Sequence, residues 1–422
     1  MDSINLKPVN NVLGEVNIPS SKSLSHRAII CAALSEGESI IKNITFSRDI
    51  YATISILKNL GISIAVFENS VKIISNGKIR LTDSTLFSDE SGSTLRFLIP
   101  VALLQEEKVI FTGAGKLIER PLNPYYKIFH EQNINYNNDN GKLPLTVQGK
   151  IKSGNFQIPG DISSQFISGL MFALPLLPND STINIEGQLE SKAYIDLTMD
   201  CLNKFGIKVI NNNYRSFYIK GNQKYVPMEY NVEGDFSQAA FFMVAGTISG
   251  EVECKNLNME SLQGDKKIVE LLKSMGAIIE EKNSSIICRK SKLSGINIDA
   301  SEIPDLVPVL AVAASLSHGR TNIYNAARLR IKECDRLAAT CRELSRLGAE
   351  IIEKDDSLII NGKETLLGGA VDSWNDHRIV MAMSIAALRC KDSVKISNYK
   401  AVNKSYPNFF EDYKSIGGNI FI

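Results

Sequence analysis

Residues 20–34 read SSKSLSHRAIICAAL, in which a short polar stretch leads directly into an apolar run. Small polar residues favour helix starts, and an apolar run of this kind is typical of a helix that is buried on all sides. The first turn of a helix is electropositive, because its N–H groups are unpaired and the helix dipole ends there. Lys22, His26 and Arg27 nevertheless follow the polar start. We therefore expect an anion to bind at this helix start.

The same kind of opening recurs along the chain at intervals of roughly 70 residues. Five further apolar helices are expected from SGSTLRFLIPVALL at Ser91, SSQFISGLMFALPLL at Ser163, FSQAAFFMVAGTISG at Phe236, IPDLVPVLAVAASLSHG at Ile303 and DHRIVMAMSIAALR at Asp376. Such regularity indicates a fold built from six repeated units.

A second, amphipathic helix recurs with the same period and ends at a glycine that fits a C-terminal cap. These glycines are Gly61, Gly206, Gly276, Gly348 and Gly417. Short β-branched stretches such as VKIIS, STINIEG and SIICR lie between the helices and are expected to be strands. The pattern predicts an α/β protein with three units per domain, in which the fourth unit begins near VEGDFSQAA at residues 232–240.

The composition limits the class of protein. The chain has 422 residues, 44% of them hydrophobic, which suggests about two domains. Its 47 basic and 46 acidic residues give a net charge of +1, so no broad field attracts nucleic acid. The seven cysteines are scattered and indicate reduced thiols, and the four histidines lack metal-ligand spacing. Without a visible signal peptide or membrane-length apolar run, we expect a soluble cytoplasmic protein with no metal and no membrane contact.

Basic residues gather at the helix openings or in the turns before them. They are Lys22, Arg27, Arg96, Arg120 and Arg378. Solvated surface charge is the simpler interpretation of any one of them, but their recurrence at equivalent positions favours a ligand with several negative charges. Nearby hydroxyls of Ser23, Ser93, Ser163 and Ser164 could bind the same ligand or cap their helices.

A second cluster lies in RLRIKECDRLAATCREL, where Lys332 and Arg336 are expected on one helix face. Glu333 lies between them and forms either a solvated ion pair with Arg336 or an acid/base group in an anion site. Asp305 in IPDLVPVL is either a helix cap or a general base. His377 in NDHR is interpreted as a structural hydrogen-bonding residue.

Nine stretches resemble one family in order along nearly the whole chain. They are SSKSLSHRA, SGSTLRF, ERPL, DISSQF, ESKAYID, IPDLVP, RIKECDR, NDHR and NKSYP. The set resembles the 3-phosphoshikimate 1-carboxyvinyltransferases, or EPSP synthases. The resemblance implies a two-domain inverted α/β barrel of six βαβαββ repeats, three per domain. It places residues 21–234 in one lobe and residues 1–20 with 235–422 in the other, with the active site in the interdomain cleft.

The implied reaction transfers the enolpyruvyl group of phosphoenolpyruvate to the 5-hydroxyl of shikimate 3-phosphate through a tetrahedral ketal, on the way to chorismate and the aromatic amino acids. The substrates are small anions, no metal or organic cofactor is needed, and a monomer is expected. Sequence patterns for ATP and NAD binding are also missing.

The resemblance assigns Asp305 as base, and Glu333 with Lys22 as proton carriers. For shikimate 3-phosphate it implies Lys22, Ser23, Arg27, Ser163, Ser164, Gln165, Ser191, Tyr194, Asp305 and Lys332. For phosphoenolpyruvate it implies Lys22, Gly92, Arg120, Gln165, Arg336, Arg378 and Lys404. Arg96 supports either substrate, and Tyr194 could alternatively be a core residue.

One departure and two alternatives accompany this interpretation. Glu90 stands where the family often has an amide, in a loop that often reads NAGTAMR, and it adds negative charge near the phosphoenolpyruvate residues. The sister enzyme that acts on UDP-N-acetylglucosamine usually has a KNAAL-type stretch and a loop cysteine, and this chain has neither. A non-catalytic anion-binding protein on the same scaffold is the second alternative.

Overall fold

A computed structural model describes residues 2–421 and divides the chain into two compact units. The middle unit is Ser20–Val232. The terminal unit comprises the residues up to Pro19 and those from Glu233 onward. Each unit has its own hydrophobic core. Within residues 2–421, no helix combines the length and apolar character needed to span a membrane.

The middle unit contains three four-stranded sheets. The first is β14 (Glu229–Asn231), β3 (Glu36–Lys42), β5 (Ser70–Asn76) and β4 (Ser63–Val66). The second is β6 (Thr85–Phe87), β7 (Val109–Thr112), β9 (Lys142–Gln148) and β8 (Asn135–Asp139). The third is β10 (Asn155–Pro159), β11 (Ser181–Glu186), β13 (Ser216–Ile219) and β12 (Val209–Asn212).

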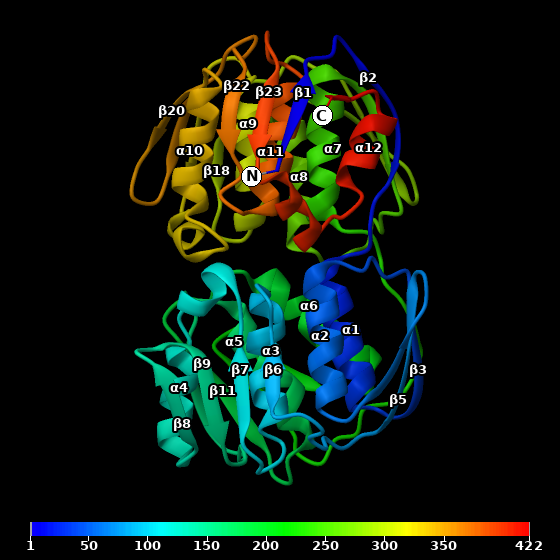
Figure 1. Cartoon of the computed structure of the whole chain (residues 1–422), viewed down its shortest axis with the longest axis vertical. Coiled ribbons are helices and arrows are strands. Elements are labelled where there is room, and N and C mark those ends of the chain that lie inside the picture. Colours follow the sequence, from blue (N-terminus) through cyan, green and yellow to red (C-terminus); the bar gives the residue numbers. More distant parts are fainter. Residues whose placement is uncertain (1, 422) are drawn as a thin grey trace. The chain divides into compact units, whose positions relative to one another are not determined.

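The terminal unit also contains three four-stranded sheets. The first is β2 (Val12–Asn17), β15 (Gly250–Lys255), β17 (Ser285–Arg289) and β16 (Ile278–Glu281). The second is β18 (Asn297–Asp299), β19 (Arg320–Tyr324), β21 (Leu358–Asn361) and β20 (Glu350–Glu353). The third is β22 (Gly369–Asp372), β23 (Val394–Ser397), β1 (Ser3–Lys7) and β24 (Asn419–Phe421), and Figure 1 shows β22, β23 and β1 side by side.

All six sheets share one pairing scheme, in which a parallel pair is followed by two antiparallel pairs. For example, β10 is parallel to β11, which is antiparallel to β13, which is antiparallel to β12. The N-terminal strands take part in this scheme, since β1 lies between β23 and β24 and β2 pairs with β15. The first residues of the chain therefore belong to the unit that contains its last residues.

The apolar helices form the cores, as the sequence predicts. In the middle unit they are α1 (Lys22–Leu34), α3 (Gly92–Ala102) and α5 (Ser164–Ala173). In the terminal unit they are α7 (Phe236–Ser249), α9 (Val307–Ser315) and α11 (His377–Ala387). Every residue of α7, α9 and α11 is buried, because these helices are packed on all sides.

The amphipathic helices are α2 (Arg48–Asn59), α4 (Asn123–Gln132), α6 (Lys192–Lys204), α8 (Ile268–Ser274), α10 (Arg336–Arg346) and α12 (Phe409–Ser415). All five glycines predicted to end such helices have positive φ, from +83° to +96°. The sequence did not reveal the sixth end, because α4 stops at Asn133, which adopts the left-handed conformation without being a glycine. Short 3-10 helices cover Gly115–Glu119, Leu174–Leu176, Gly264–Lys267, Pro304–Leu306, Ala327–Ile331 and Tyr399–Lys404.

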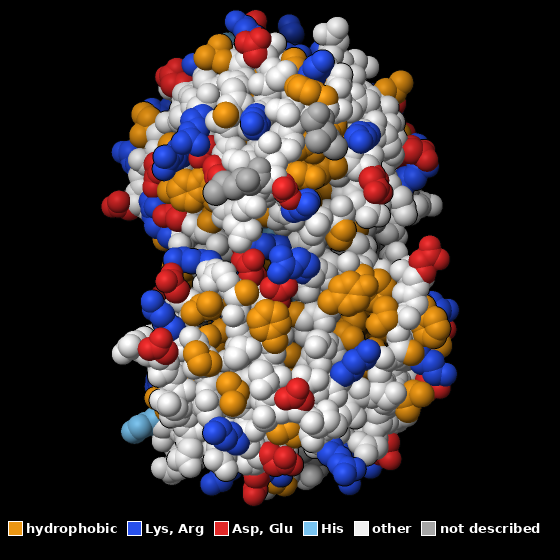
Figure 2. Space-filling view, viewed as in Figure 1, with side chains coloured by type: hydrophobic (Ala, Val, Ile, Leu, Met, Phe, Trp, Pro, Cys, Tyr) orange, Lys and Arg blue, Asp and Glu red, His pale blue; other side chains and the backbone are white. Residues whose placement is uncertain are grey.

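Acidic and basic side chains are interspersed over the face of each unit drawn in Figure 2. This mixture agrees with the near-zero net charge of the chain. The charges that could bind a ligand are therefore concentrated locally, within the clusters described next.

Candidate active site

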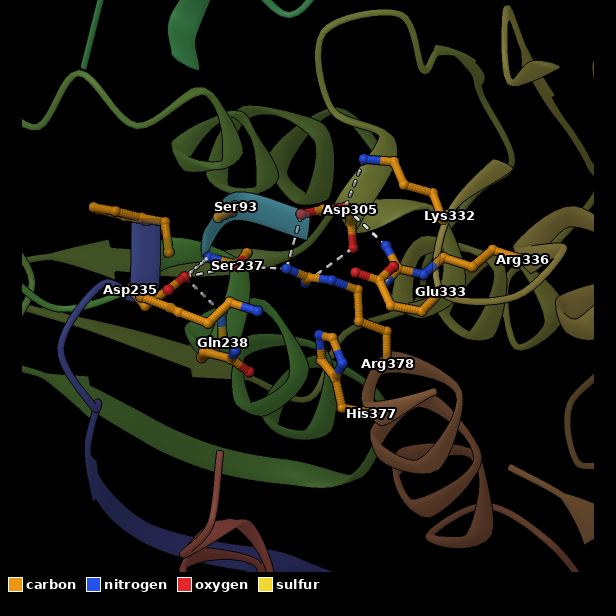
Figure 3. Close-up of polar contacts among 12 residues, drawn as sticks. Ser93, Asp235, Ser237, Gln238, Asp305, Lys332, Glu333, Arg336, His377 and Arg378 are labelled. Atoms are coloured by element: carbon orange, nitrogen blue, oxygen red, sulfur yellow. Dashed lines mark hydrogen bonds and ion pairs between the residues drawn. The ribbon is translucent and has the colours of Figure 1, made fainter. Parts of the chain in front are cut away.

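Arg336 lies at the centre of a charged cluster in the terminal unit (Figure 3). It is the first residue of α10, and its side chain is only 1% exposed. The guanidinium contacts Asp376 at 2.7 Å, Asp305 at 2.8 Å and Glu333 at 2.6 Å. Burial opposes its charge, but the three carboxylates outweigh burial and raise the pKa of Arg336 above its ordinary value.

Asp305 faces three cations instead of capping a helix. It lies in the 3-10 helix Pro304–Leu306, and no side chain caps the start of α9. The capping interpretation is therefore wrong. The carboxylate lies 2.8 Å from Arg336, 2.9 Å from Arg378 and 3.6 Å from Lys332.

The charges of this cluster change the proton affinities of its members. Burial raises the pKa of Asp305, but Arg378, Lys332 and Arg336 together hold it well below its ordinary value. Burial lowers the pKa of Lys332 to about 8, although Asp305 acts in the opposite direction. Asp305 is thus ionised at neutral pH, and Lys332 titrates near physiological pH.

Lys332 and Glu333 do not lie on the predicted helix face. The 3-10 helix before them ends at Ile331 and α10 begins at Arg336, so both residues precede the helix. Lys332 and Arg336 still meet, because both contact Asp305. The predicted pair of Glu333 and Arg336 is present, but the burial of Arg336 rules out a fully solvated pair.

Asp376 orders the start of α11. Its carboxylate caps the helix by accepting from the backbone N–H of Arg378 at 2.8 Å, while it also binds Arg336. The Arg378 side chain donates to Asp305 and, at 3.1 Å, to the hydroxyl of Ser237. His377 is buried beside them, with its Nδ1 3.9 Å from Asp376, which is beyond hydrogen-bond distance, so its hydrogen-bonding role stays a prediction.

Lys404 is nearly fully buried in the same unit. Its Nζ donates to the backbone carbonyl of Asn375 at 2.6 Å. Asn375 directly precedes Asp376, so one short turn connects Lys404 to the partner of Arg336.

The middle unit contains the opening stretch of α1. Ser21 caps this helix by accepting from the N–H of Leu24, as its sequence predicts. Lys22 donates to Asp49 at 2.8 Å. The anionic partner at this helix start is thus a carboxylate of α2, which the sequence analysis missed. An acid after Ser47 in the first turn of α2 is usual for any helix, so no local signal singled it out.

Arg27 is buried and joins α1 to α6. It donates to Thr198 at 2.8 Å, to the carbonyl of Ser23 at 2.7 Å and to the carbonyl of Tyr194 at 3.0 Å. Its guanidinium also lies over the ring of Phe97. Burial lowers the pKa of Arg27 to about 10. The solvated-charge interpretation is wrong for this residue, and the side chain of Tyr194 packs partly against the core.

Gln165 connects the starts of α3 and α5. It accepts from Arg96 at 2.8 Å and donates to Ser93 at 2.9 Å. Ser163 caps α5 by accepting from the N–H of Gln165 at 3.3 Å, and Ser164 is the first residue of that helix. The structure therefore brings together predicted residues from two different repeats.

Gly92 and Arg120 are in close contact. A Cβ placed on Gly92 would lie 2.6 Å from an Nη atom of Arg120, so only glycine leaves this guanidinium in place. The Glu90 side chain lies against Gly115, the first residue of the 3-10 helix that ends just before Arg120. Ser191 is buried and adopts a left-handed conformation, φ +55°, immediately before α6.

Two further buried acids of the terminal unit were not singled out by the sequence. Asp376 is the second residue of NDHR, but nothing in the sequence shows that it binds Arg336, which is 40 positions away. Glu343 is completely buried on α10 and reads in the sequence as an ordinary helix residue. Among residues 2–421, no group of three or more His, Cys, Asp or Glu side chains could hold a metal ion.

Comparison with known proteins identifies the family. Residues 6–413 match the family model described as EPSP synthase (3-phosphoshikimate 1-carboxyvinyltransferase). The chain belongs to the EPSP synthase family. A protein of Clostridium novyi strain NT named 3-phosphoshikimate 1-carboxyvinyltransferase is 55% identical, and the match covers 100% of this chain and 98% of that protein. One of Clostridium acetobutylicum with the same name is also 55% identical, over 96% of both chains.

A solved structure of EPSP synthase from Acinetobacter baumannii is similar over the full length of both chains, with a TM-score of 0.84 and 25% sequence identity. These matches confirm the family resemblance and the predicted two-domain inverted α/β barrel. As a member of this family the chain is a transferase of the shikimate pathway, which moves an enolpyruvyl group from phosphoenolpyruvate to shikimate 3-phosphate.

Proposed function

We propose that the clusters of both units bind the two anionic substrates of the family reaction. Arg336, Arg378 and Lys404 supply buried positive charge in the terminal unit, as binding of a phosphate and a carboxylate requires. The proposed phosphoenolpyruvate ligands are these three residues and, from the middle unit, Lys22, Gly92, Arg120 and Gln165. On this proposal, the two compact units are the two catalytic lobes, predicted as residues 21–234 and residues 1–20 with 235–422.

The proposed ligands of shikimate 3-phosphate are likewise drawn from both units. Hydroxyls and cations at the starts of α1, α5 and α6 suit a phosphate and a carboxylate. These residues are Lys22, Ser23, Arg27, Ser163, Ser164, Gln165, Ser191 and Tyr194, with Asp305 and Lys332 from the terminal unit. Arg96 supports Gln165 through their hydrogen bond.

The observation that carries the catalytic proposal is the position of Asp305 among Arg336, Arg378 and Lys332. A general base must be ionised before it can accept a proton, and these cations keep the carboxylate ionised. The same cations make it a weak base. Substrate anions that bind them offset their charge, so the pKa of Asp305 rises when the substrates are bound. The base is therefore strengthened only in the complex.

The reaction then proceeds in two steps. In the first, protonated Glu333 gives its proton to the methylene carbon of phosphoenolpyruvate, the 5-hydroxyl oxygen attacks the adjacent carbon, and Asp305 takes the hydroxyl proton. The product is the tetrahedral ketal. In the second step, Glu333 removes a proton from the new methyl group while the C–O bond to phosphate breaks, which leaves the enolpyruvyl ether. Lys22 assists the proton transfers, and the hydroxyl proton taken by Asp305 passes to the departing phosphate, so both carboxyl groups return to their starting states.

The test is phosphate release from phosphoenolpyruvate by the purified protein, with and without shikimate 3-phosphate, together with the mass of the product. We expect release only with the shikimate ester. Asp305→Asn and Glu333→Gln should each lower turnover by about 10²- to 10⁴-fold while they keep the fold. Glu281→Gln, which removes an exposed acid of the same unit, is the control and should leave turnover unchanged.

Two outcomes would contradict the assignments. Full turnover in either variant removes that residue from its proposed role. Release that requires UDP-N-acetylglucosamine as acceptor, or no release with either acceptor, would instead favour the sister enzyme or a binding protein.

We also propose that the protein acts as a cytoplasmic monomer on small anions, without binding nucleic acid or membranes. All seven cysteines are free thiols and six are buried, as is typical of a reducing compartment. The interspersed surface charges of Figure 2 favour small local ligands over a nucleic-acid backbone. Light scattering during size-exclusion chromatography measures the mass of the protein in solution. The mass of a dimer would overturn the proposed monomer.

A further inference from the structure

Glu343 is a buried carboxylate of the terminal unit that the proposed reaction does not use. It lies on α10 seven residues after Arg336, two helical turns along the same side of the helix. Its side chain is 0% exposed. Burial of a carboxylate is unfavourable unless hydrogen bonds and charge partners compensate, so its three partners indicate what the residue does.

Two of the three partners lie at the end of β22 and in the turn that follows it. Glu343 accepts from the indole N–H of Trp374 at 2.8 Å and from the backbone N–H of Asp372 at 3.0 Å. The third partner, Arg346, contacts it at 2.9 Å and is 42% exposed. A carboxylate of α10 therefore holds both a side chain and a backbone group of the segment that precedes α11.

The turn that Glu343 contacts has an unfavourable backbone conformation. Trp374 and Asn375 have φ of +53° and +52°, two consecutive left-handed residues that are not glycine. A left-handed conformation is unfavourable for a bulky residue such as tryptophan and persists only where the surroundings enforce it. The Asp372 carboxylate, which accepts from the N–H of Trp374 at 2.6 Å, is one such contact, and the hydrogen bond from the Trp374 indole to Glu343 is a second.

The turn leads directly to proposed phosphoenolpyruvate residues. The carbonyl of Asn375 accepts from Lys404 at 2.6 Å. The next residue, Asp376, binds Arg336 and caps the helix that begins before Arg378. The direction of the Asn375 carbonyl and the place of Asp376 both depend on the left-handed backbone before them. All three proposed cations of this unit thus depend on the turn.

We propose that Glu343 is a positioning residue that acts through the Trp374–Asn375 turn to place Lys404, Arg336 and Arg378 for phosphoenolpyruvate. This inference rests on the proposed roles of those three cations. Glu343 binds Trp374, Asp372 and Arg346, so its effect on the three cations passes through the backbone of the turn and through Asp376. Its loss should affect phosphoenolpyruvate more than shikimate 3-phosphate, most of whose proposed ligands lie in the middle unit.

The test compares Glu343→Gln and Trp374→Phe with wild type and with Arg346→Ala. Glutamine keeps the size of the side chain but presents only one acceptor oxygen, and phenylalanine removes the indole N–H. In both we expect KM for phosphoenolpyruvate to rise about tenfold, with KM for shikimate 3-phosphate within twofold of wild type. Arg346→Ala removes only the exposed partner and should leave both KM values within twofold.

Fluorescence provides a second readout, since Trp374 is the single tryptophan of the chain. In Glu343→Gln, the indole loses its charged acceptor, so we expect its emission to shift and its quenching by acrylamide to increase. A role in stability alone would lower the melting temperature without separating the two KM values.

The outcomes separate the inference from the function on which it rests. Wild-type KM values in folded Glu343→Gln, or equal rises for both substrates, would overturn the inference and leave the function intact. If Glu343→Gln does not fold, Trp374→Phe decides by the same criterion. An unchanged KM for phosphoenolpyruvate in Lys404→Ala would instead contradict the proposed role of that lysine.

Discussion

Asp305 lies 2.8 Å from Arg336, although 31 positions separate the two residues in the sequence. Asp305 precedes one apolar helix, α9, and Arg336 begins the following amphipathic helix, α10. Their contact places a carboxylate where it is strongly influenced by positive charge. The proton affinity of this carboxylate should therefore respond to whatever neutralises that charge.

The first prediction concerns the pH dependence of this response. Asp305 acts in its ionised form, so activity falls as pH falls through its pKa. In the free protein Arg378, Lys332 and Arg336 hold that pKa well below its ordinary value despite burial. Bound substrate anions offset these charges, so the acid limb of kcat should lie at higher pH than that of kcat/KM. Rate profiles from pH 4 to 8 measure the acid limb of kcat, whereas kcat/KM should show no acid limb from Asp305 within this range; acid limbs at the same pH would contradict the proposed strengthening of the base.

The second prediction concerns Lys332. Burial lowers its pKa to about 8, so the side chain loses its proton as pH rises through that value. The neutral amine binds an anion less well, and kcat/KM for shikimate 3-phosphate should decline above pH 8. Lys332→Arg keeps the positive charge at these pH values and should move the decline to higher pH. An unshifted decline in the variant would assign it to another group.

The sequence predicted the repeat well because each unit depends on local signals. Ser21, Ser91 and Ser163 cap the helices that they were expected to start. The end of α4 was missed because Asn133 takes a conformation that the pattern assigns to glycine. The pattern alone also did not show that the N-terminal strands pair with β15, β23 and β24, because such pairing depends on contacts between distant segments. Only the family resemblance implied it.

The sequence predicted the cations of the candidate site together with Asp305 and Glu333, but not the carboxylates Asp49, Asp376 and Glu343. Lys22, Arg336 and Arg378 stand out because helix starts disfavour positive charge. Asp49 and Glu343 lie within amphipathic helices, where acids are common, and only tertiary packing gives them their partners. Lys332 lies before α10 instead of on it because Asp335 caps that helix, which therefore begins at Arg336. The sequence shows where charged residues are, but the pairs that they form depend on the tertiary structure.

The third prediction concerns Gly92. An alanine there suits a helix start, but its Cβ would lie 2.6 Å from an Nη atom of Arg120 and displace the guanidinium. Gly92→Ala should therefore keep or slightly raise the melting temperature while KM for phosphoenolpyruvate rises on the order of 10- to 100-fold.

The double variant Gly92→Ala with Arg120→Lys shows whether the effect passes through Arg120. Lysine lacks the planar fork, so the second substitution alone should also raise KM. If Gly92→Ala acts through Arg120, the rise in KM in the double variant is smaller than the product of the two single-variant rises. Independent, multiplicative effects would mean that the added methyl group acts on the substrate directly.

The fourth prediction concerns His26, which is buried on α1 with its Nδ1 2.8 Å from the hydroxyl of Thr53. Burial, with Lys22 and Arg27 adding repulsion, lowers the pKa of His26 well below its ordinary value. In the unfolded chain His26 therefore binds a proton near pH 6.5, whereas in the folded protein it stays neutral at that pH. Below that pH this residue should lower the free energy of unfolding by about 1.4 kcal/mol per pH unit until the folded form is also protonated.

Urea unfolding between pH 5 and 7.5 measures this slope, and NMR of the four histidine rings shows which of them stays neutral. His26→Gln should flatten the slope, because glutamine has no proton to gain, whereas His130→Gln at an exposed position should leave it as in wild type. If the His26 ring titrates near pH 6.5 in the folded protein, burial does not exclude its charged form. The start of α1 would then tolerate a third positive charge beside Lys22 and Arg27, and the single carboxylate of Asp49 would not account for the charge balance there.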